Sequence, residues 1–310
     1  MMNKVSIIGA GQVGAATGLF IAQKQIANLL LVDVVPGLAQ GKALDLSQAA
    51  PVEGYGIRIA GTEKFAEIEG SEVVVVTAGV ARRPGMSRLD LLEKNASIVK
   101  GIAQDIAKYA PLALLIMVTN PLDLLTYLAW KVTGFPPQRI LGQAGILDTA
   151  RFRHFVAQEL GVSAEDVSAM VLGGHGDTMV PLPRYTCVSG VPVTELLSAE
   201  RIAELVERTR RGGAEIVALL KTGSASFAPG AAAAQMVEAI LRDQKRILPC
   251  SAYLQGEYGI EGVFVGVPVR LGAQGVEEVL ELKLTSEELK VLRASAEVYR
   301  QGIEQLTPYL

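Results

Sequence analysis

Val5-Ser6-Ile7-Ile8-Gly9-Ala10-Gly11-Gln12-Val13-Gly14 is the stretch that decides the fold of this chain. Its first four residues form a short apolar run that predicts a β-strand, and glycines follow that strand directly. Gly9 permits a tight turn, Gly11 lets the backbone approach a pyrophosphate, and Gly14 lets a helix pack closely on the strand. The helix that begins here offers free amide groups and a partial positive charge to the phosphates. The order of strand, glycine turn and helix therefore predicts a dinucleotide-binding site.

Asp33 indicates which dinucleotide the site accepts. It follows the second predicted strand, Leu29–Val32, where an acceptor for the hydroxyl groups of the adenosine ribose belongs. A carboxylate at this position repels a 2′-phosphate, and the next residues, Val34-Val35-Pro36, contain no arginine that could bind one. The sequence therefore predicts NAD rather than NADP.

The first half of the chain alternates short apolar runs with helical patterns. The runs are continuous, as in parallel strands that are covered on both faces. This alternation predicts an α/β fold with a doubly wound parallel sheet. The predicted strands are Val5–Ile8, Leu29–Val32, Ile57–Ala60, Val73–Thr77 and Leu112–Val118, and the predicted helices are Val13–Gln25, Leu38–Gln48, Leu89–Tyr109 and Leu122–Val132.

The pattern changes after about Gly145, which predicts a dinucleotide-binding domain over residues 1–144 and an α+β domain over residues 145–310. Tight turn residues at Ser189-Gly190 predict an antiparallel hairpin. The predicted helices here are Leu147–Leu160, Ala199–Leu220, Phe227–Leu241 and one within Ser286–Leu306, and the predicted strands are Val167–Leu172, Arg184–Val188, Val191–Val193, Ile247–Leu254 and Val263–Val269.

Composition excludes several classes of protein. The 310 residues include 29 basic and 32 acidic residues, so no strongly basic surface is expected for nucleic acid or for an anionic membrane. The longest apolar run, Leu112–Val118, is much shorter than a membrane-spanning helix needs. Cys187 and Cys250 are too few for a disulfide framework or a four-thiolate metal site, and no metal is expected. The start of the chain reads as a strand rather than a signal peptide, so a cytoplasmic enzyme is expected.

His175 is the candidate for proton transfer, because the chain has only two histidines and His154 lies in the middle of a predicted helix. His175 follows an apolar strand within Gly173-Gly174-His175-Gly176-Asp177, and the alternative is a loop histidine without a catalytic role. Asp148 and Arg151 share one face of a predicted helix. A carboxylate beside an imidazole stabilises its protonated form, and an arginine binds a substrate carboxylate well. An ordinary surface ion pair is the alternative for Asp148 and Arg151.

Two further groups of residues follow parallel strands at the edge where open α/β sheets bind ligands. The loop after Val73–Thr77 carries Arg82, Arg83 and Arg88, and is either a solvated loop or a cationic lid for an anionic substrate. Asn120 ends another strand, and its amide either binds the nicotinamide ribose or a substrate oxygen, or belongs to a turn before proline.

Taken together, these motifs resemble the lactate/malate dehydrogenase family, specifically its lactate-dehydrogenase-like malate dehydrogenases. The resemblance covers nearly the whole chain and implies a Rossmann domain followed by a substrate domain. The motifs that carry it are Gly9–Gly14, Val76-Thr77-Ala78-Gly79, the arginine loop, Val118-Thr119-Asn120-Pro121, Leu147-Asp148-Thr149-Ala150-Arg151 and Gly173-Gly174-His175-Gly176-Asp177.

The resemblance implies a role for each site residue. His175 exchanges the proton with Asp148 as its partner, Arg151 binds the C1 carboxylate, Arg88 polarises the C2 oxygen, and Asn120 contacts cofactor or substrate. The expected NAD contacts are Gly9, Gly11, Gln12, Val13, Gly14, Asp33, Thr77, Gly79, Asn95, Val118 and Asn120.

The substrate expected from the resemblance is a small dicarboxylate, malate or oxaloacetate. Lactate enzymes usually carry glutamine six residues before Arg88, where this chain has Arg82, and threonine where it has Ala225. Arg83, next to Arg82, is the alternative partner for the second carboxylate. Two other functions stay open, namely a dehydrogenase of lactate or another 2-hydroxy acid and a non-catalytic NAD sensor. The resemblance also implies a homotetramer or a homodimer.

Overall fold

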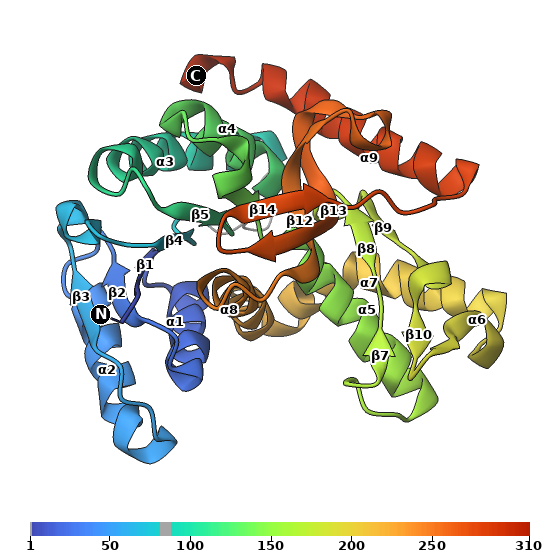
Figure 1. The fold of residues 1–310 in the computed structure, drawn as a ribbon, viewed down its shortest axis with the longest axis horizontal. Helices are drawn as coiled ribbons and strands as arrows, with labels where there is room; N and C mark the ends of the chain where they lie inside the picture. The colour runs from blue at the N-terminus through green and yellow to red at the C-terminus, as the bar shows by residue number, and fades with distance from the viewer. Residues whose placement is uncertain (1, 81–87) are drawn as a thin grey trace.

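The first half of the chain forms a twisted parallel sheet in a computed structural model that describes residues 2–80 and 88–310 (Figure 1). Neighbouring strands run in the order β3, β2, β1, β4, β5, β6, so the chain starts near the middle and winds outward in both directions. The strands are β1 (Lys4–Ile8), β2 (Asn28–Val32), β3 (Ile59–Thr62), β4 (Val73–Val76), β5 (Leu114–Met117) and β6 (Ile140–Gly142). Because the order reverses between β1 and β4, their carboxyl ends form the crevice where such sheets bind ligands.

Helices cover both faces of this sheet, which explains why its strands are apolar throughout. Alternate residues of β1 enter different cores: Ile7 packs with α1 and α2, whereas Ile8 packs with α3 and α4 on the opposite face. Figure 1 shows α3 and α4 on one side of the strands and α1 and α8 on the other. The helices of this half are α1 (Gln12–Lys24), α2 (Leu38–Glu53), α3 (Arg88–Tyr109) and α4 (Leu122–Thr133).

The second half extends the same sheet with antiparallel strands. Ser251 of β12 pairs with Gly142 of β6, and β13, β8 and β9 continue the sheet beyond β12 while β14 pairs with β13. Strands β7, β10 and β11 form a small separate sheet. The strands of this half are β7 (Val167–Ser168), β8 (Val171–Gly173), β9 (Met179–Pro181), β10 (Cys187–Val188), β11 (Val191–Pro192), β12 (Arg246–Gln255), β13 (Glu261–Gly272) and β14 (Gly275–Val279).

Long helices pack around these strands, with α5 leading out of the parallel sheet and α8 returning to pack against α1. The helices are α5 (Ala144–Leu160), α6 (Val193–Leu196), α7 (Ala199–Leu220), α8 (Phe227–Leu241) and α9 (Ser286–Glu304), and short 3₁₀ turns occupy Phe65–Ile68, Pro137–Arg139, Pro183–Tyr185, Glu257–Gly259 and Thr307–Tyr309. Within the described residues, none of these helices is both long and apolar enough to cross a membrane.

The predicted α/β class and doubly wound sheet are confirmed, and α7 and α8 have the predicted bounds. The hairpin at Ser189-Gly190 is also present, with positive φ at both residues as its tight turn requires. Strands β6, β9 and β14 were not predicted, because short strands give little periodicity to detect. The strand predicted over Arg184–Val188 is only partly correct, since residues 183–185 form a 3₁₀ turn after Pro183.

Candidate active site

The glycine turn after β1 has no room for side chains where it meets the rest of the fold. Gly9 has φ +98°, and a Cβ there would lie 2.6 Å from the Ala78 nitrogen. A Cβ on Gly14 would lie 1.9 Å from the Gly9 carbonyl oxygen. Gly11 differs, because a Cβ there would have no described atom within 4 Å. The turn is thus pressed against the sheet at both ends and open above Gly11, as a backbone that receives a pyrophosphate must be.

The first turn of α1 has donors for an anion. Gly11 is its N-cap residue and provides no side-chain cap, so the amides of Gln12 and Val13 are not bonded within the helix. Asp33 lies beside the turn at the end of β2, where its two carboxylate oxygens accept from the amides of Ala10 (2.7 Å) and Val35 (3.0 Å). Each oxygen keeps a further lone pair for a ribose hydroxyl. These groups fit NAD, with phosphates above Gly11 and ribose at Asp33.

The other predicted cofactor residues lie at the ends of β4 and β5. The Thr77 hydroxyl donates to the Gly9 carbonyl oxygen (2.9 Å), and Gly79 passes so close to Thr119 that a Cβ would lie 2.5 Å from its methyl carbon. Val118 follows β5, and Asn120 is exposed at the same edge of the sheet. These positions line the crevice between the two diverging halves of the parallel sheet.

Asn95 of α3 is fully buried, and its side chain joins two backbone segments of this edge. Its Oδ1 accepts from the Val80 amide (2.7 Å), while Nδ2 donates to the carbonyl oxygens of Val80 (3.1 Å) and Asn120 (2.7 Å). The resemblance implied a contact between Asn95 and the cofactor, and that contact stays a prediction. In the structure, Asn95 holds together the backbone segments that follow β4 and β5.

His175, Asp148 and Arg151 lie together. The Asp148 carboxylate places Oδ2 at 2.9 Å from His175 Nδ1 and Oδ1 at 3.1 Å from a terminal nitrogen of Arg151. Asp148 is 2% exposed, so this bridge between imidazole and guanidinium is sheltered from water. The contact at Nδ1 leaves Nε2 of the ring as the nitrogen that can exchange a proton with a ligand.

The carboxylate changes the acidity of the imidazole. Burial disfavours the charged ring, but the charge of Asp148 and its hydrogen bond outweigh burial, so the pKa of His175 lies above its ordinary value. The nearby Arg151 opposes this effect. His175 therefore holds a proton more firmly than a free histidine does, which suits a group that alternates between accepting and donating one.

Arg151 is only partly paired. Its Nε is buried and has no hydrogen-bond partner among residues 2–80 and 88–310. The guanidinium lies beside α7 at two consecutive glycines: a Cβ on Gly212 would be a tight 3.2 Å from Arg151 Cδ, and one on Gly213 would be in ordinary contact, 3.5 Å from a terminal nitrogen. A buried donor without a partner is costly, and an arginine fork is well suited to a carboxylate.

Several side chains that hold the His175 loop were missed by the sequence analysis. Asp123 of α4 accepts a hydrogen bond from the His175 amide (3.1 Å), and Ser251 of β12 donates to Asp123 (2.6 Å). From α9, Ser295 accepts from the Gly174 amide (2.9 Å) and Tyr299 donates to the His175 carbonyl oxygen (3.3 Å). A carboxylate in the first turn of the largely apolar helix after Pro121 was a signal that the sequence offered for Asp123.

Most of the arginine loop lies outside the residues that the structure describes. Arg82 and Arg83 belong to the residues that the structure does not describe, so their predicted contact with a second carboxylate is untested. Arg88 begins α3, and its side chain lies outside the described part as well. The roles predicted for these arginines stay predictions.

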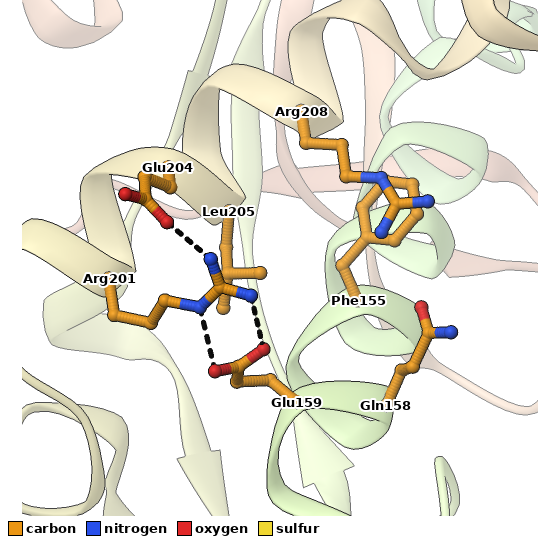
Figure 2. A pocket seen from close by; sticks show the side chains of 7 residues that line it. All are labelled: Phe155, Gln158, Glu159, Arg201, Glu204, Leu205 and Arg208. Carbon is orange, nitrogen blue, oxygen red and sulfur yellow. Dashed lines mark hydrogen bonds and ion pairs between the residues drawn. The ribbon is translucent and has the colours of Figure 1, made fainter.

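A separate pocket of about 440 Å³ lies between α5 and α7 (Figure 2). Arg201 contacts Glu159 through two hydrogen bonds and also contacts Glu204, while the Arg208 guanidinium lies 4.3 Å from the centre of the Phe155 ring. Arg208 is itself paired with Glu215. Because carboxylates of the chain already bind both arginines, this pocket lacks the incomplete pairing seen at Arg151.

A sheet edge shaped for a dinucleotide, with an imidazole bonded to a buried carboxylate in the same molecule, places this protein among the NAD-dependent dehydrogenases. More narrowly, the chain belongs to the lactate/malate dehydrogenase family. Residues 3–142 match the family's NAD-binding domain, and residues 146–308 match its alpha/beta C-terminal domain.

Relatives across the full length support this assignment. The chain is 56% identical to a malate dehydrogenase of Roseiflexus sp. (strain RS-1) over 99% of both chains. It is 55% identical to a malate dehydrogenase of Methanosarcina barkeri over 98% of this chain and 99% of that one. The solved malate dehydrogenase of Picrophilus torridus has a TM-score of 0.96 at 48% identity, covering 99% of this chain and 98% of that one. A Cryptosporidium parvum lactate dehydrogenase, solved with lactic acid and NAD, also reaches 0.96, at 42% identity and with the same coverage.

Proposed function

We propose that this protein catalyses the reversible, NAD-dependent oxidation of (S)-malate to oxaloacetate. The observation that carries the proposal is the Asp148 carboxylate, which bonds the His175 imidazole through one oxygen and the Arg151 guanidinium through the other. One buried carboxylate thus aligns a proton acceptor with a carboxylate-binding cation. A 2-hydroxy acid presents a hydroxyl and a carboxylate on neighbouring carbons, and these two groups match the two side chains.

His175 moves the proton. In malate oxidation the neutral ring accepts the proton of the C2 hydroxyl at Nε2, and the Asp148 carboxylate at Nδ1 stabilises the imidazolium that forms. When bound, NAD would supply the acceptor for the hydride that leaves C2 of malate. In the reverse direction the protonated ring donates to the carbonyl oxygen of oxaloacetate. The raised pKa of His175 keeps the protonated form available for this direction.

Arg151 orients the substrate. Its partly buried guanidinium bonds Asp148 at one nitrogen, and the unpartnered Nε is available as a further donor. A bound C1 carboxylate would receive hydrogen bonds from this fork and neutralise its charge. We propose that Arg82 binds the second carboxylate, that Arg88 polarises the C2 oxygen, and that Asn120 contacts the substrate or the nicotinamide ribose.

The two halves of the chain divide this work. Residues 1–144 hold NAD, through the glycine turn, the first turn of α1, Asp33, Thr77, Gly79, Val118 and Asn120, with Asn95 supporting the backbone around them. Residues 145–310 contribute the imidazole and the arginine. Chemistry takes place where β6 and β12 join these halves into one sheet.

Absorbance assays with NADH test the activity. We expect rapid NADH oxidation with oxaloacetate, much slower oxidation with pyruvate, and little activity with NADPH. A preference for pyruvate would identify a lactate dehydrogenase instead, which the similarity to the Cryptosporidium parvum enzyme makes the natural second candidate. NADH binding without turnover of either 2-oxo acid would indicate an NAD sensor.

Assembly and location are further parts of the proposal. We infer a homodimer or a homotetramer, which light scattering on the purified protein distinguishes from a monomer. The expected location is the cytoplasm, to be checked by fractionating cells that express the protein.

A further inference from the structure

Asp123 is a buried carboxylate whose contacts are unlike those of Asp148. It lies in the first turn of α4, is 1% exposed, and has a partner at each oxygen. Oδ2 accepts from the main-chain amide of His175 (3.1 Å), and Oδ1 accepts from the Ser251 hydroxyl (2.6 Å). Burying a carboxylate is costly unless hydrogen bonds compensate. Neither bond is made to a group that the proposed substrate or NAD would contact.

The three residues of this chain of hydrogen bonds belong to three different parts of the fold. Asp123 follows Asn120 at the start of α4, so it belongs to the half that holds the cofactor. Ser251 pairs with Gly142, where the parallel and antiparallel parts of the sheet meet. His175 follows β8 in the other half. Asp123 thus ties the loop of the proton-exchanging imidazole to the cofactor half at the junction of the two.

We propose that Asp123 is a positioning residue for His175, which it holds in place by binding the main chain of that residue. This inference rests on the proposed function, because it assigns Asp123 to the proton transfer carried out by His175. Asp148 fixes the ring at Nδ1, whereas Asp123 fixes the backbone from which the ring extends. With the main chain and Nδ1 both held, the position of Nε2 is fixed by this chain's own side chains.

The negative charge of Asp123 affects a quantity that can be measured, the pKa of His175. The groups that face His175 are Asp148 and Arg151 from α5, Asp123 from α4 and the Tyr299 hydroxyl from α9. The negative charge of Asp123 adds to that of Asp148 in raising the pKa of His175, and Arg151 opposes both. Burial raises the pKa of Asp123 itself, while the hydrogen bonds from Ser251 and from the His175 amide oppose that effect.

Two substitutions separate position from charge. Asp123→Asn preserves both contacts, because its oxygen can accept from the His175 amide while its NH₂ group donates to Ser251, but the negative charge is lost. Asp123→Ala removes both hydrogen bonds. Thr126→Val is the matched control, since Thr126 is buried one turn later on α4 and its hydroxyl donates within that helix, to the Leu122 carbonyl oxygen (2.8 Å).

NMR titration of the imidazoles supplies a readout that does not depend on activity. The chain has two histidines, so His154→Gln assigns the remaining ring signal to His175. We expect the His175 titration of Asp123→Asn to move to lower pH, with the pH profile of kcat/KM moving the same way. For Asp123→Ala we expect kcat to fall about 10²-fold, the size of effect that a misplaced catalytic group produces. NADH binding should persist in both variants, and Thr126→Val should match the unsubstituted protein throughout.

Two results would overturn the inference. One is a titration and a kcat that match the unsubstituted protein in both Asp123 variants. The other is a loss of activity in Asp123→Ala with the His175 titration unmoved, because that loss would reflect stability alone. If Asp123→Ala does not fold, Ser251→Ala takes its place in the kcat measurement, because it removes the hydroxyl that holds Oδ1 of Asp123 and leaves the charge of Asp123 in place. A failure of the proposed function is recognised separately, since the unsubstituted protein would then not turn over oxaloacetate.

Discussion

Helices α5 and α7 contact each other along one seam. The arginines at the two ends of this seam differ in whether their guanidinium groups are fully paired. At one end, Arg201 and Arg208 of α7 are paired with glutamates around the pocket of Figure 2. At the other end, Arg151 of α5 lies against Gly212 and Gly213, bonds Asp148 at one nitrogen, and leaves Nε buried without a partner in the described part of the chain. The residue type and the helices are the same, but the pairing is not.

This difference teaches where the fold keeps an interaction for a ligand. A buried donor without a partner costs about 1–3 kcal/mol, which folding alone gives no reason to retain at Arg151. A bound carboxylate would remove that penalty. The guanidinium groups of Arg201 and Arg208 are already paired with glutamates of this chain. Exposed ion pairs of this kind contribute little to stability. Incomplete pairing, rather than the number of charges, therefore marks the ligand-binding end of the seam.

The largest effect is expected from removing the imidazole at the ligand-binding end. His175→Ala should lower kcat by about 10²–10⁴-fold, because general acid–base catalysis contributes that much. NADH binding should be retained, because the residues that fit NAD lie in the other half of the chain. Stopped-flow turnover of oxaloacetate and fluorescence titration with NADH measure the two quantities. Near-normal kcat in this variant would remove His175 from the mechanism.

A substitution of Arg151 tests whether the incompletely paired arginine binds the substrate. Arg151→Lys keeps the charge but loses the planar fork that bonds Asp148 and, as proposed, the substrate. We expect kcat/KM for oxaloacetate to fall by about 10- to 150-fold, with much of the loss in KM, because a hydrogen bond to a charged group contributes about 1.5–3 kcal/mol. Steady-state kinetics with varied oxaloacetate provide the measurement. An unchanged KM would mean that the substrate carboxylate is bound elsewhere.

The parts of this site that were predictable from sequence are local. The glycine turn and Asp33 each follow a strand directly, so the order of strand, turn and helix along the sequence was enough to identify them. Asp148 and Arg151 are three residues apart in one predicted helix, so their spacing alone indicated that the two side chains lie close together. The link from this pair to His175 came from the resemblance, since 27 residues separate Asp148 from His175 and no periodicity joins them.

What was missed depends on packing between distant segments. The bond from Ser251 to Asp123 spans 128 residues, and the bond from Ser295 to Gly174 spans 121. Strand β6 escaped prediction for a related reason: it is three residues long and becomes a strand by pairing between β5 and β12. The bonds from Asn95 to the backbone of Val80 and Asn120 were missed as well, because only the fold brings these two segments to its side chain.

The pH profile of Asp148→Asn offers a finer test, because this substitution removes the charge of Asp148 with little change in shape. Reduction of oxaloacetate requires protonated His175, so its kcat/KM should fall as pH rises through the raised pKa of that residue. Asp148→Asn removes the charge that raises this pKa, and the fall should therefore occur at lower pH. Oxidation of malate requires the neutral ring, and its rise with pH should shift in the same direction. Profiles that do not move would separate Asp148 from the protonation of His175.

The smallest effect is expected at the paired end of the seam. Arg208 is exposed, bonds Glu215 at 2.9 and 3.2 Å, and covers the Phe155 ring. Arg208→Gln removes the charge and leaves Glu215 in water, where an unpaired carboxylate is well solvated. We expect kcat/KM for oxaloacetate to stay within about twofold of the unsubstituted value, because Arg208 is exposed and water and salt screen its charge.

The melting temperature provides the matching stability readout for Arg208→Gln. Any change should be small and should shrink further as salt is added, since salt screens the exposed pair that is lost. Arg151→Lys, measured in parallel, should keep its kinetic defect at every salt concentration because its partner Asp148 is buried. If Arg208→Gln instead reduced kcat/KM as strongly as Arg151→Lys, the two ends of the seam would act as one unit. The contrast between paired and unpaired arginines would then not locate the site.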